Sequence, residues 1–158
     1  MMKKINHEDH EGHEVTIDHE TDPFSLRRMR AASPLSPEAE RAMHATIGCA
    51  IAVHRALGPG YLESIYKKAM CVELGIRGLR YANEQSVDVI YRGIPISGQR
   101  VDLIVEGLIV VELKAVESLA AIHRAQAISY LRTTGLRGGL LLNFRVRVLK
   151  DGLQRIVL

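Results

Sequence analysis

Two neighbouring segments of the chain, residues 99–105 and 108–116, are mostly apolar at successive positions. A strand with one face in water alternates apolar and polar residues, whereas a strand covered on both faces is apolar throughout. We therefore expect these segments to be central strands of a sheet. Residues 139–143 have the same character and predict another buried strand. The fold must then cover both faces of this sheet.

Apolar residues at helical spacing predict the elements that supply this cover. The expected helices are residues 37–57, 62–74 and 119 to about 135. An alternating segment at 81–91 predicts one further strand. A closing hairpin is expected at the C-terminus, with strands at 145–150 and 153–158 around a turn at Asp151-Gly152. With the closing hairpin counted as one β element, the predicted order is α-α-β-β-β-α-β-β, that of a mixed α/β fold.

The length of 158 residues is typical of one compact domain. Residues 1–37 lack helical or strand periodicity and end in a run of serine and proline, so we expect a flexible extension, with the folded domain at 38–158. The extension contains His7, His10, His13 and His19 among acidic residues. If helical, the first three would share a stripe able to bind zinc or nickel, whereas a solvated tail is the alternative.

The charge of the chain is divided unevenly. Residues 1–22 contain two lysines and seven acids, and residues 23–158 contain nineteen lysines and arginines against eleven acids. The folded part is therefore basic, and its few aromatic residues favour contact with phosphate over stacking on bases. Nucleic acid is the expected partner.

No apolar run approaches the roughly 18 residues of a membrane span, and the N-terminal residues are too polar for a secretion signal. Cys49 and Cys71 have no metal-binding spacing and are expected to be buried, reduced thiols. We therefore expect a soluble, cytoplasmic protein without membrane contact. The oligomeric state stays open, a homo-oligomer included.

Three charged residues interrupt the predicted central strands. Asp102 lies within the first apolar segment, and Glu112 and Lys114 lie within the second. Charges in buried strands are costly unless they are paired or bound to a ligand. Because side chains two apart share a face of a strand, Glu112 and Lys114 project together.

Whether Asp102 joins them depends on the length of the loop between the strands. A two-residue loop would send Asp102 to the opposite face, whereas a three-residue loop at 105–107, with Gly107 in the left-handed region, would pair Asp102 with Val110 and place it diagonally from Glu112. We expect the three-residue loop.

Polar residues on two predicted helices could complete the site. Glu63 lies three residues before Tyr66 on the second helix, and Gln126 and Tyr130 lie one turn apart on the third. If these faces meet the strands, Glu63, Asp102 and Glu112 exceed Lys114 by about two negative charges, and carboxylate oxygens favour Mg²⁺ or Mn²⁺. Each residue alone also has an ordinary interpretation, as a solvated helix position or an exposed ion pair.

The segment from Gly60 to Tyr66, GYLESIY, resembles the signature of the GxxExxY proteins, a prokaryotic group in the PD-(D/E)xK nuclease superfamily. Further similar segments are Val53 to Gly60, Arg100 to Leu103, Glu112 to Ala115, His123 to Leu131, Asn143-Phe144 and Asp151-Gly152. The resemblance covers about residues 45–158. It implies a restriction-endonuclease-like core, αβββαβ, with a mixed sheet flanked by helices and an extra C-terminal hairpin strand.

The resemblance also implies roles for the residues at matching positions. Asp102, Glu112 and Lys114 stand for the superfamily's D and ExK, Glu63 for a helical acid that completes the metal site, and Gln126 with Tyr130 for its QxxxY element. The sequence has Val101 where the superfamily's name has proline.

The expected function is therefore hydrolysis of nucleic acid with Mg²⁺ or Mn²⁺, with Glu63, Asp102 and Glu112 as metal ligands and Lys114, Gln126 and Tyr130 in the catalytic site. The alternative is a catalytically silent binding or regulatory module with the same fold. A third interpretation is metal sensing by the histidine-rich extension. DNA or RNA as substrate and endo or exo cleavage stay open.

Overall fold

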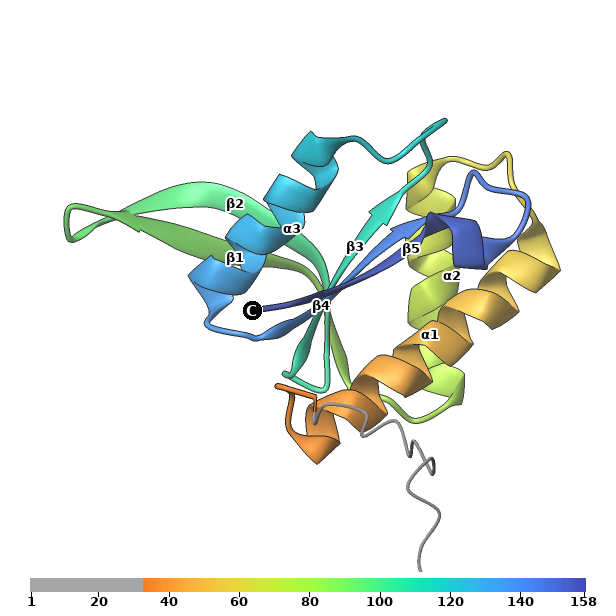
Figure 1. The fold of residues 1–158 in the computed structure, drawn as a ribbon, viewed down its shortest axis with the longest axis horizontal. Helices are drawn as coiled ribbons and strands as arrows, with labels where there is room; N and C mark the ends of the chain where they lie inside the picture. Colours follow the sequence, from red (N-terminus) through yellow and green to blue (C-terminus); the bar gives the residue numbers. More distant parts are fainter. Residues whose placement is uncertain (1–32) are drawn as a thin grey trace, which may run out of the picture. The chain divides into compact units, whose positions relative to one another are not determined.

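A computed structural model describes residues 33–158, which form a five-stranded mixed sheet with helices on both faces (Figure 1). The helices are α1 (Pro37–Leu57), α2 (Glu63–Ile76) and α3 (Ala121–Thr134), with a short 3-10 helix, η1 (Leu149–Gly152). The strands are β1 (Tyr81–Tyr91), β2 (Ile94–Val105), β3 (Ile109–Lys114), β4 (Gly138–Asn143) and β5 (Leu153–Val157). The predicted α/β class is confirmed, and the predicted element order holds except that the closing hairpin is a single strand, β5.

The sheet has the spatial order β1-β2-β3-β4-β5. Strand β3 runs parallel to β4, and every other neighbouring pair is antiparallel. The parallel step requires a crossover, which α3 provides between β3 and β4. All six residues of β4 are buried, as are the first five of β3, so the expectation of strands covered on both faces is correct for these two strands. In residues 99–105 of β2 only alternate residues are fully buried.

Two apolar clusters lie on opposite faces of the sheet. The larger cluster joins α1 and α2 to one face, with Met43, Tyr66 and Leu113 among its fully buried members. The smaller cluster joins α3 to the other face through Ala127 and Leu131. In Figure 1, α3 accordingly lies on the opposite side of the sheet from α1 and α2.

Helix α1 begins and ends where the sequence indicates. The Ser36 hydroxyl accepts a hydrogen bond from the Ala39 N–H at 3.2 Å, and Pro37 occupies the first helical position. The helix ends at Gly58, whose φ of 67° lies in the region that favours glycine. Leu35, two residues before the helix, is buried and belongs to the larger cluster.

The hairpin of β1 and β2 extends away from the rest of the fold (Figure 1). Its turn is at Arg92-Gly93, as expected, and both residues have positive φ. The apolar side chains near this turn are largely exposed; they are Val89, Ile90, Tyr91, Ile94 and Ile96. Strand β2 begins at Ile94, five residues earlier than its apolar pattern predicts, because the two strands stay paired to the turn.

The prediction of a strand at 145–150 is wrong. These residues form bends and the start of η1, and β5 pairs with β4 instead. Side chains from elsewhere bind this backbone: His54 contacts the Val146 carbonyl at 2.8 Å, and the Asn143 amide oxygen accepts from the Arg145 N–H at 3.2 Å. The long-range contact from His54 and the local one from Asn143 hold the segment out of strand geometry, and local alternation reveals neither.

Within residues 33–158, no helix is long and apolar enough to cross a membrane. Cys49 is buried, Cys71 is half-buried, and neither forms a disulfide. The predicted zinc or nickel stripe of His7, His10 and His13 lies outside the described residues.

Candidate active site

The loop between β2 and β3 sets the position of Asp102. Val105 pairs with Ile109, which leaves a three-residue loop at 106–108 with Gly107 at a φ of 68°. The predicted odd loop length is therefore correct, but the loop begins one residue later than expected. Ile104 pairs with Val110, and continuation of this register puts Asp102 opposite Glu112 rather than opposite Val110.

Asp102 lies where the strands separate. The last ladder pair between β2 and β3 is Leu103 with Val111. Beyond it, one carboxylate oxygen of Asp102 accepts a hydrogen bond from the Leu113 N–H at 3.0 Å. The carboxylate thus replaces a ladder bond at the end of the pairing. This contact fixes Asp102 beside the backbone of the strand that carries Glu112.

The other oxygen of Asp102 accepts from the Lys67 ammonium at 3.2 Å. Lys67 also binds Glu84 of β1 at 2.8 Å, so one lysine joins α2 to two strands. Burial lowers the pKa of Lys67, but the nearby Glu84 and Asp102 carboxylates outweigh it and raise that pKa. Sequence reasoning missed Lys67, although its place one helical turn after Glu63 was the available signal.

Glu112 is the most deeply buried of the acids at this site, with 2% of its surface exposed. Its Oε1 accepts from the Lys114 ammonium at 2.6 Å, whereas its Oε2 is buried and has no hydrogen-bond partner. Burial, together with the charges of Asp102 and Glu63, raises the pKa of Glu112 to about 7 despite the nearby ammonium. The site therefore contains a carboxylate whose negative charge is incompletely balanced.

Lys114 is held at the end of β3 by its surroundings. Burial lowers its pKa, but the hydrogen bond to Glu112 and the charges of Glu112, Glu63 and Asp102 outweigh this and raise it. The ammonium therefore stays protonated. The backbone beyond Lys114 is tied to β4, because the Asn143 amide donates to the Val116 carbonyl at 2.8 Å and accepts from its N–H at 3.1 Å.

Glu63 is the first residue of α2, where a carboxylate interacts favourably with the positive end of the helix dipole. Tyr66, one turn later, fixes this end of the helix: its hydroxyl donates to the Gly58 carbonyl at 2.6 Å and accepts from the Tyr61 N–H at 3.1 Å. Its ring stacks on Phe144 at 4.6 Å between centroids. Glu63 is close enough for its charge to affect the pKa values of Glu112 and Lys114.

The predicted polar residues of α3 approach the same carboxylates. The Gln126 amide donates to the Tyr130 hydroxyl at 2.7 Å. Burial raises the pKa of Tyr130, and the charges of Glu112 and Asp102 add to the effect. The phenol therefore faces the acidic residues from the opposite side of the sheet to α2, and it keeps its proton near neutral pH.

The donor set of this site suits a hard divalent cation. Asp102 and Glu112 offer carboxylate oxygens, and the unpartnered Oε2 of Glu112 is a buried acceptor that a cation would satisfy. Among residues 33–158, however, no three His, Cys, Asp or Glu side chains already form a group that could hold a metal ion. Glu63 therefore stays a predicted third ligand.

The two lysines and four acids of this region leave a net charge of about −2, with Glu84 and Lys67 included. A divalent cation would balance this charge. Residues from α2, β2, β3 and α3 thus influence one another's charge at one end of the sheet, with Lys67 and Glu84 in addition to the predicted residues.

Comparison with known families agrees with this arrangement. The family model described as the PD-(D/E)XK nuclease superfamily matches residues 40–156. The matched region includes all six residues predicted for the site. No curated protein and no solved structure gives a significant match to the chain.

Proposed function

Because the chain belongs to the PD-(D/E)XK nuclease superfamily, we propose that it hydrolyses phosphodiester bonds of nucleic acid with Mg²⁺ or Mn²⁺. The observation that carries this proposal is the unpartnered Oε2 of Glu112, a buried carboxylate oxygen beside Asp102 and a lysine. In a purely structural ion pair, a buried acceptor of this kind usually has a hydrogen-bond partner. The basic charge of residues 23–158 and the GxxExxY segment at Gly60 to Tyr66 support this proposal. We place the activity in the cytoplasm.

Nucleases of this superfamily generally use divalent metal ions. Asp102 and Glu112 would hold the ion, with Glu63 directly or through water; when bound, it would polarise the scissile phosphate and lower the pKa of the attacking water. The Leu113 N–H and Lys67 hold Asp102 in place for this task. The 2.6 Å hydrogen bond from the Lys114 ammonium holds the Glu112 carboxylate in place in the same way.

Lys114 has the properties of a group that stabilises negative charge in the transition state. Its ammonium is protonated at neutral pH and largely shielded from water, with 13% of the side chain exposed. Electrostatic stabilisation is strongest where water is excluded. Gln126 and Tyr130 offer an amide and a phenol that would orient the phosphate from the α3 side.

The test is cleavage of end-labelled DNA and RNA, single- and double-stranded, by the purified full chain with Mg²⁺ or Mn²⁺. Lys114→Ala should lower turnover by roughly a hundredfold or more while binding changes little. Lys68→Ala removes an exposed lysine of α2 and serves as the matched control. Equal cleavage by Lys114→Ala, or no cleavage of any substrate by the unaltered chain, would refute the proposal.

One observation favours the silent module as a second candidate. Lys67 and Lys114 already bind the two carboxylates that would hold the ion. If these pairs are permanent, the domain binds nucleic acid without cleaving it. Calorimetric titration with Mn²⁺ separates the candidates, because heat of binding that Asp102→Asn abolishes supports the enzyme, and the absence of heat supports the module.

A further inference from the structure

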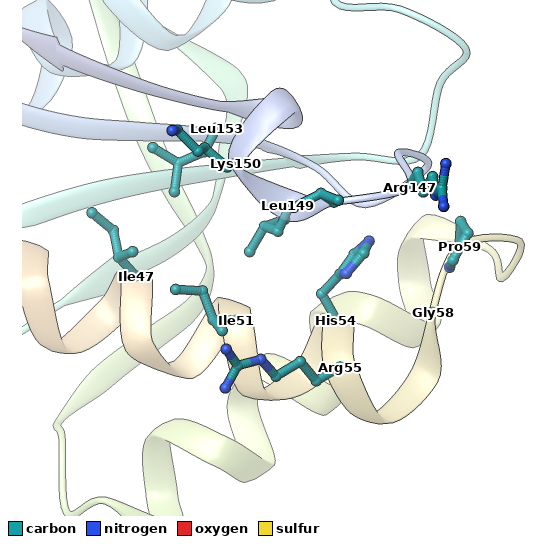
Figure 2. Close-up of a pocket in the computed structure, with 11 residues that line it drawn as sticks. Ile47, Ile51, His54, Arg55, Gly58, Pro59, Arg147, Leu149, Lys150 and Leu153 are labelled. Carbon is teal, nitrogen blue, oxygen red and sulfur yellow. The ribbon is translucent and has the colours of Figure 1, made fainter.

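A pocket of about 630 Å³ lies on the α1 side of the fold and shares no residue with the candidate active site (Figure 2). Its size is within the range of about 300–1,000 Å³ that is usual for small-molecule sites. Helix α1 forms one wall, and the segment from Arg147 to Leu153 forms the other. The lining is mainly aliphatic and includes Ile47, Ile51, Leu149 and Leu153.

The two walls are fixed to each other. The His54 Nε2 lies 2.8 Å from the Val146 carbonyl oxygen, which can only accept, so this nitrogen donates. His54 and Leu149 are both buried. The end of the pocket at Gly58 is held as well, because the Tyr66 hydroxyl donates to the Gly58 carbonyl. The pocket is therefore formed before any ligand arrives.

The charged residues that line the pocket are all cationic. Arg55, Arg147 and Lys150 come from the two walls, and no acidic residue lines it. Within the part of the chain that the structure describes, none of these three forms an ion pair. Figure 2 shows their charged ends on different sides of the pocket, with Arg147 beside Pro59, so one anionic group would contact one cation while the aliphatic floor contacts an apolar body.

We propose that this pocket binds a nucleotide through its terminal phosphate and its base. A phosphate monoester carries up to two negative charges and accepts several hydrogen bonds, so it suits the guanidinium of Arg147 better than a carboxylate would. The aliphatic floor would contact the flat face of the base. The nucleotide is either a free nucleoside monophosphate or the 5′-phosphorylated end of a nucleic acid strand.

The proposal is tested by calorimetric titration of the full chain in EDTA, so that the metal site plays no part. The probes are adenosine 5′-monophosphate, inorganic phosphate, and one short deoxyoligonucleotide with and without its 5′-phosphate. Arg147→Ala should weaken binding of the phosphorylated probe about tenfold, as expected for one charged hydrogen bond. Arg145→Ala, two residues away in the same exposed segment but outside the lining, should change binding by less than about twofold.

Each arm of the experiment has a defined meaning. Binding of the monophosphate that depends on Arg147 identifies a free nucleotide, and Arg147-dependent binding of the phosphorylated oligonucleotide alone identifies a strand end. Inorganic phosphate that binds as tightly as the nucleotide, equal effects of Arg145→Ala and Arg147→Ala, or no binding of either phosphorylated probe would overturn the proposal. The titration is done without metal and measures binding alone. Its outcome therefore does not depend on whether the chain is a nuclease.

Discussion

The replacement Glu112→Gln tests whether burial or the Lys114 ion pair has the larger effect on the pKa of Glu112. The folded chain raises the pKa of Glu112 from its ordinary value of 4.5 to about 7. The folded state therefore binds the proton more tightly than the unfolded state does. The resulting destabilisation is absent below pH 4.5, develops as the pH rises to about 7, and is complete above it.

The size of the effect follows from the two pKa values. They differ by about 2.5, and each pKa unit corresponds to about 1.36 kcal/mol, which gives about 3 kcal/mol at high pH. Glutamine has nearly the same shape but does not ionise. Relative to the unaltered chain, Glu112→Gln should therefore gain about 2–3 kcal/mol in the free energy of unfolding between about pH 5 and about pH 8.5.

Urea unfolding in EDTA at both pH values measures this difference and cancels effects that do not depend on pH. Glu117→Gln replaces an exposed acid near the end of the same strand and serves as the control. The reasoning fails if the gain is equal at both pH values. It also fails if Glu112→Gln becomes relatively less stable at high pH, because the Lys114 ammonium would then outweigh burial.

Four further changes test the metal site and the fold around it. Mn²⁺ at about one hundred times its dissociation constant should stabilise the unaltered chain by about 2.7 kcal/mol in thermal unfolding, and Asp102→Asn should lose this gain. Asn143→Ala should lower the free energy of unfolding in urea by roughly 2 kcal/mol, since its buried amide binds two backbone segments. Gly152→Ala should cost about 1–3 kcal/mol by the same measurement, because an added Cβ would collide with the Asn143 carbonyl oxygen. Gly75→Ala, which has open space, should instead stabilise α2 by about 0.5–1 kcal/mol.

Three of these expectations have a defined opposite result. An equal Mn²⁺ effect in Asp102→Asn would remove that residue from the ligand set. Asn83→Ala, at an exposed position of β1, is the control for Asn143→Ala, and equal losses would mean that the buried amide has no special role. A Gly152→Ala chain as stable as the original would show that the backbone near Asn143 can move without cost.

The order of the elements could be predicted because it depends on local patterns. Helical spacing, glycines at helix ends and strands apolar on both faces act within a few residues, and they placed α1 to within a residue. Asp102, Glu112 and Lys114 stood out for the same reason, since charges within such strands are costly. Loop parity predicts that Asp102 shares the face of Glu112, and in the structure its carboxylate accepts from the Leu113 N–H beside Glu112.

Properties that depend on distant residues could not be predicted. The register between β2 and β3 differs from the prediction by two residues, with Asp102 opposite Glu112 instead of Val110. The hydrophobic pattern cannot distinguish these two registers, because a shift of two residues keeps the same side chains on each face. The loop at 145–148 is held by contacts with His54 and Asn143. His54 is far from the loop in the sequence, and the sequence pattern shows Asn143 only as the end of a buried strand.

The sequence by itself determined the α/β class and the charged residues in the central strands, since periodicity and the cost of burying charge are local properties. Only the tertiary structure decided that Lys67 binds Asp102, that Oε2 of Glu112 has no partner, and that three cations surround an aliphatic pocket. These features depend on distances between separate elements, which are set by how the helices pack on the sheet.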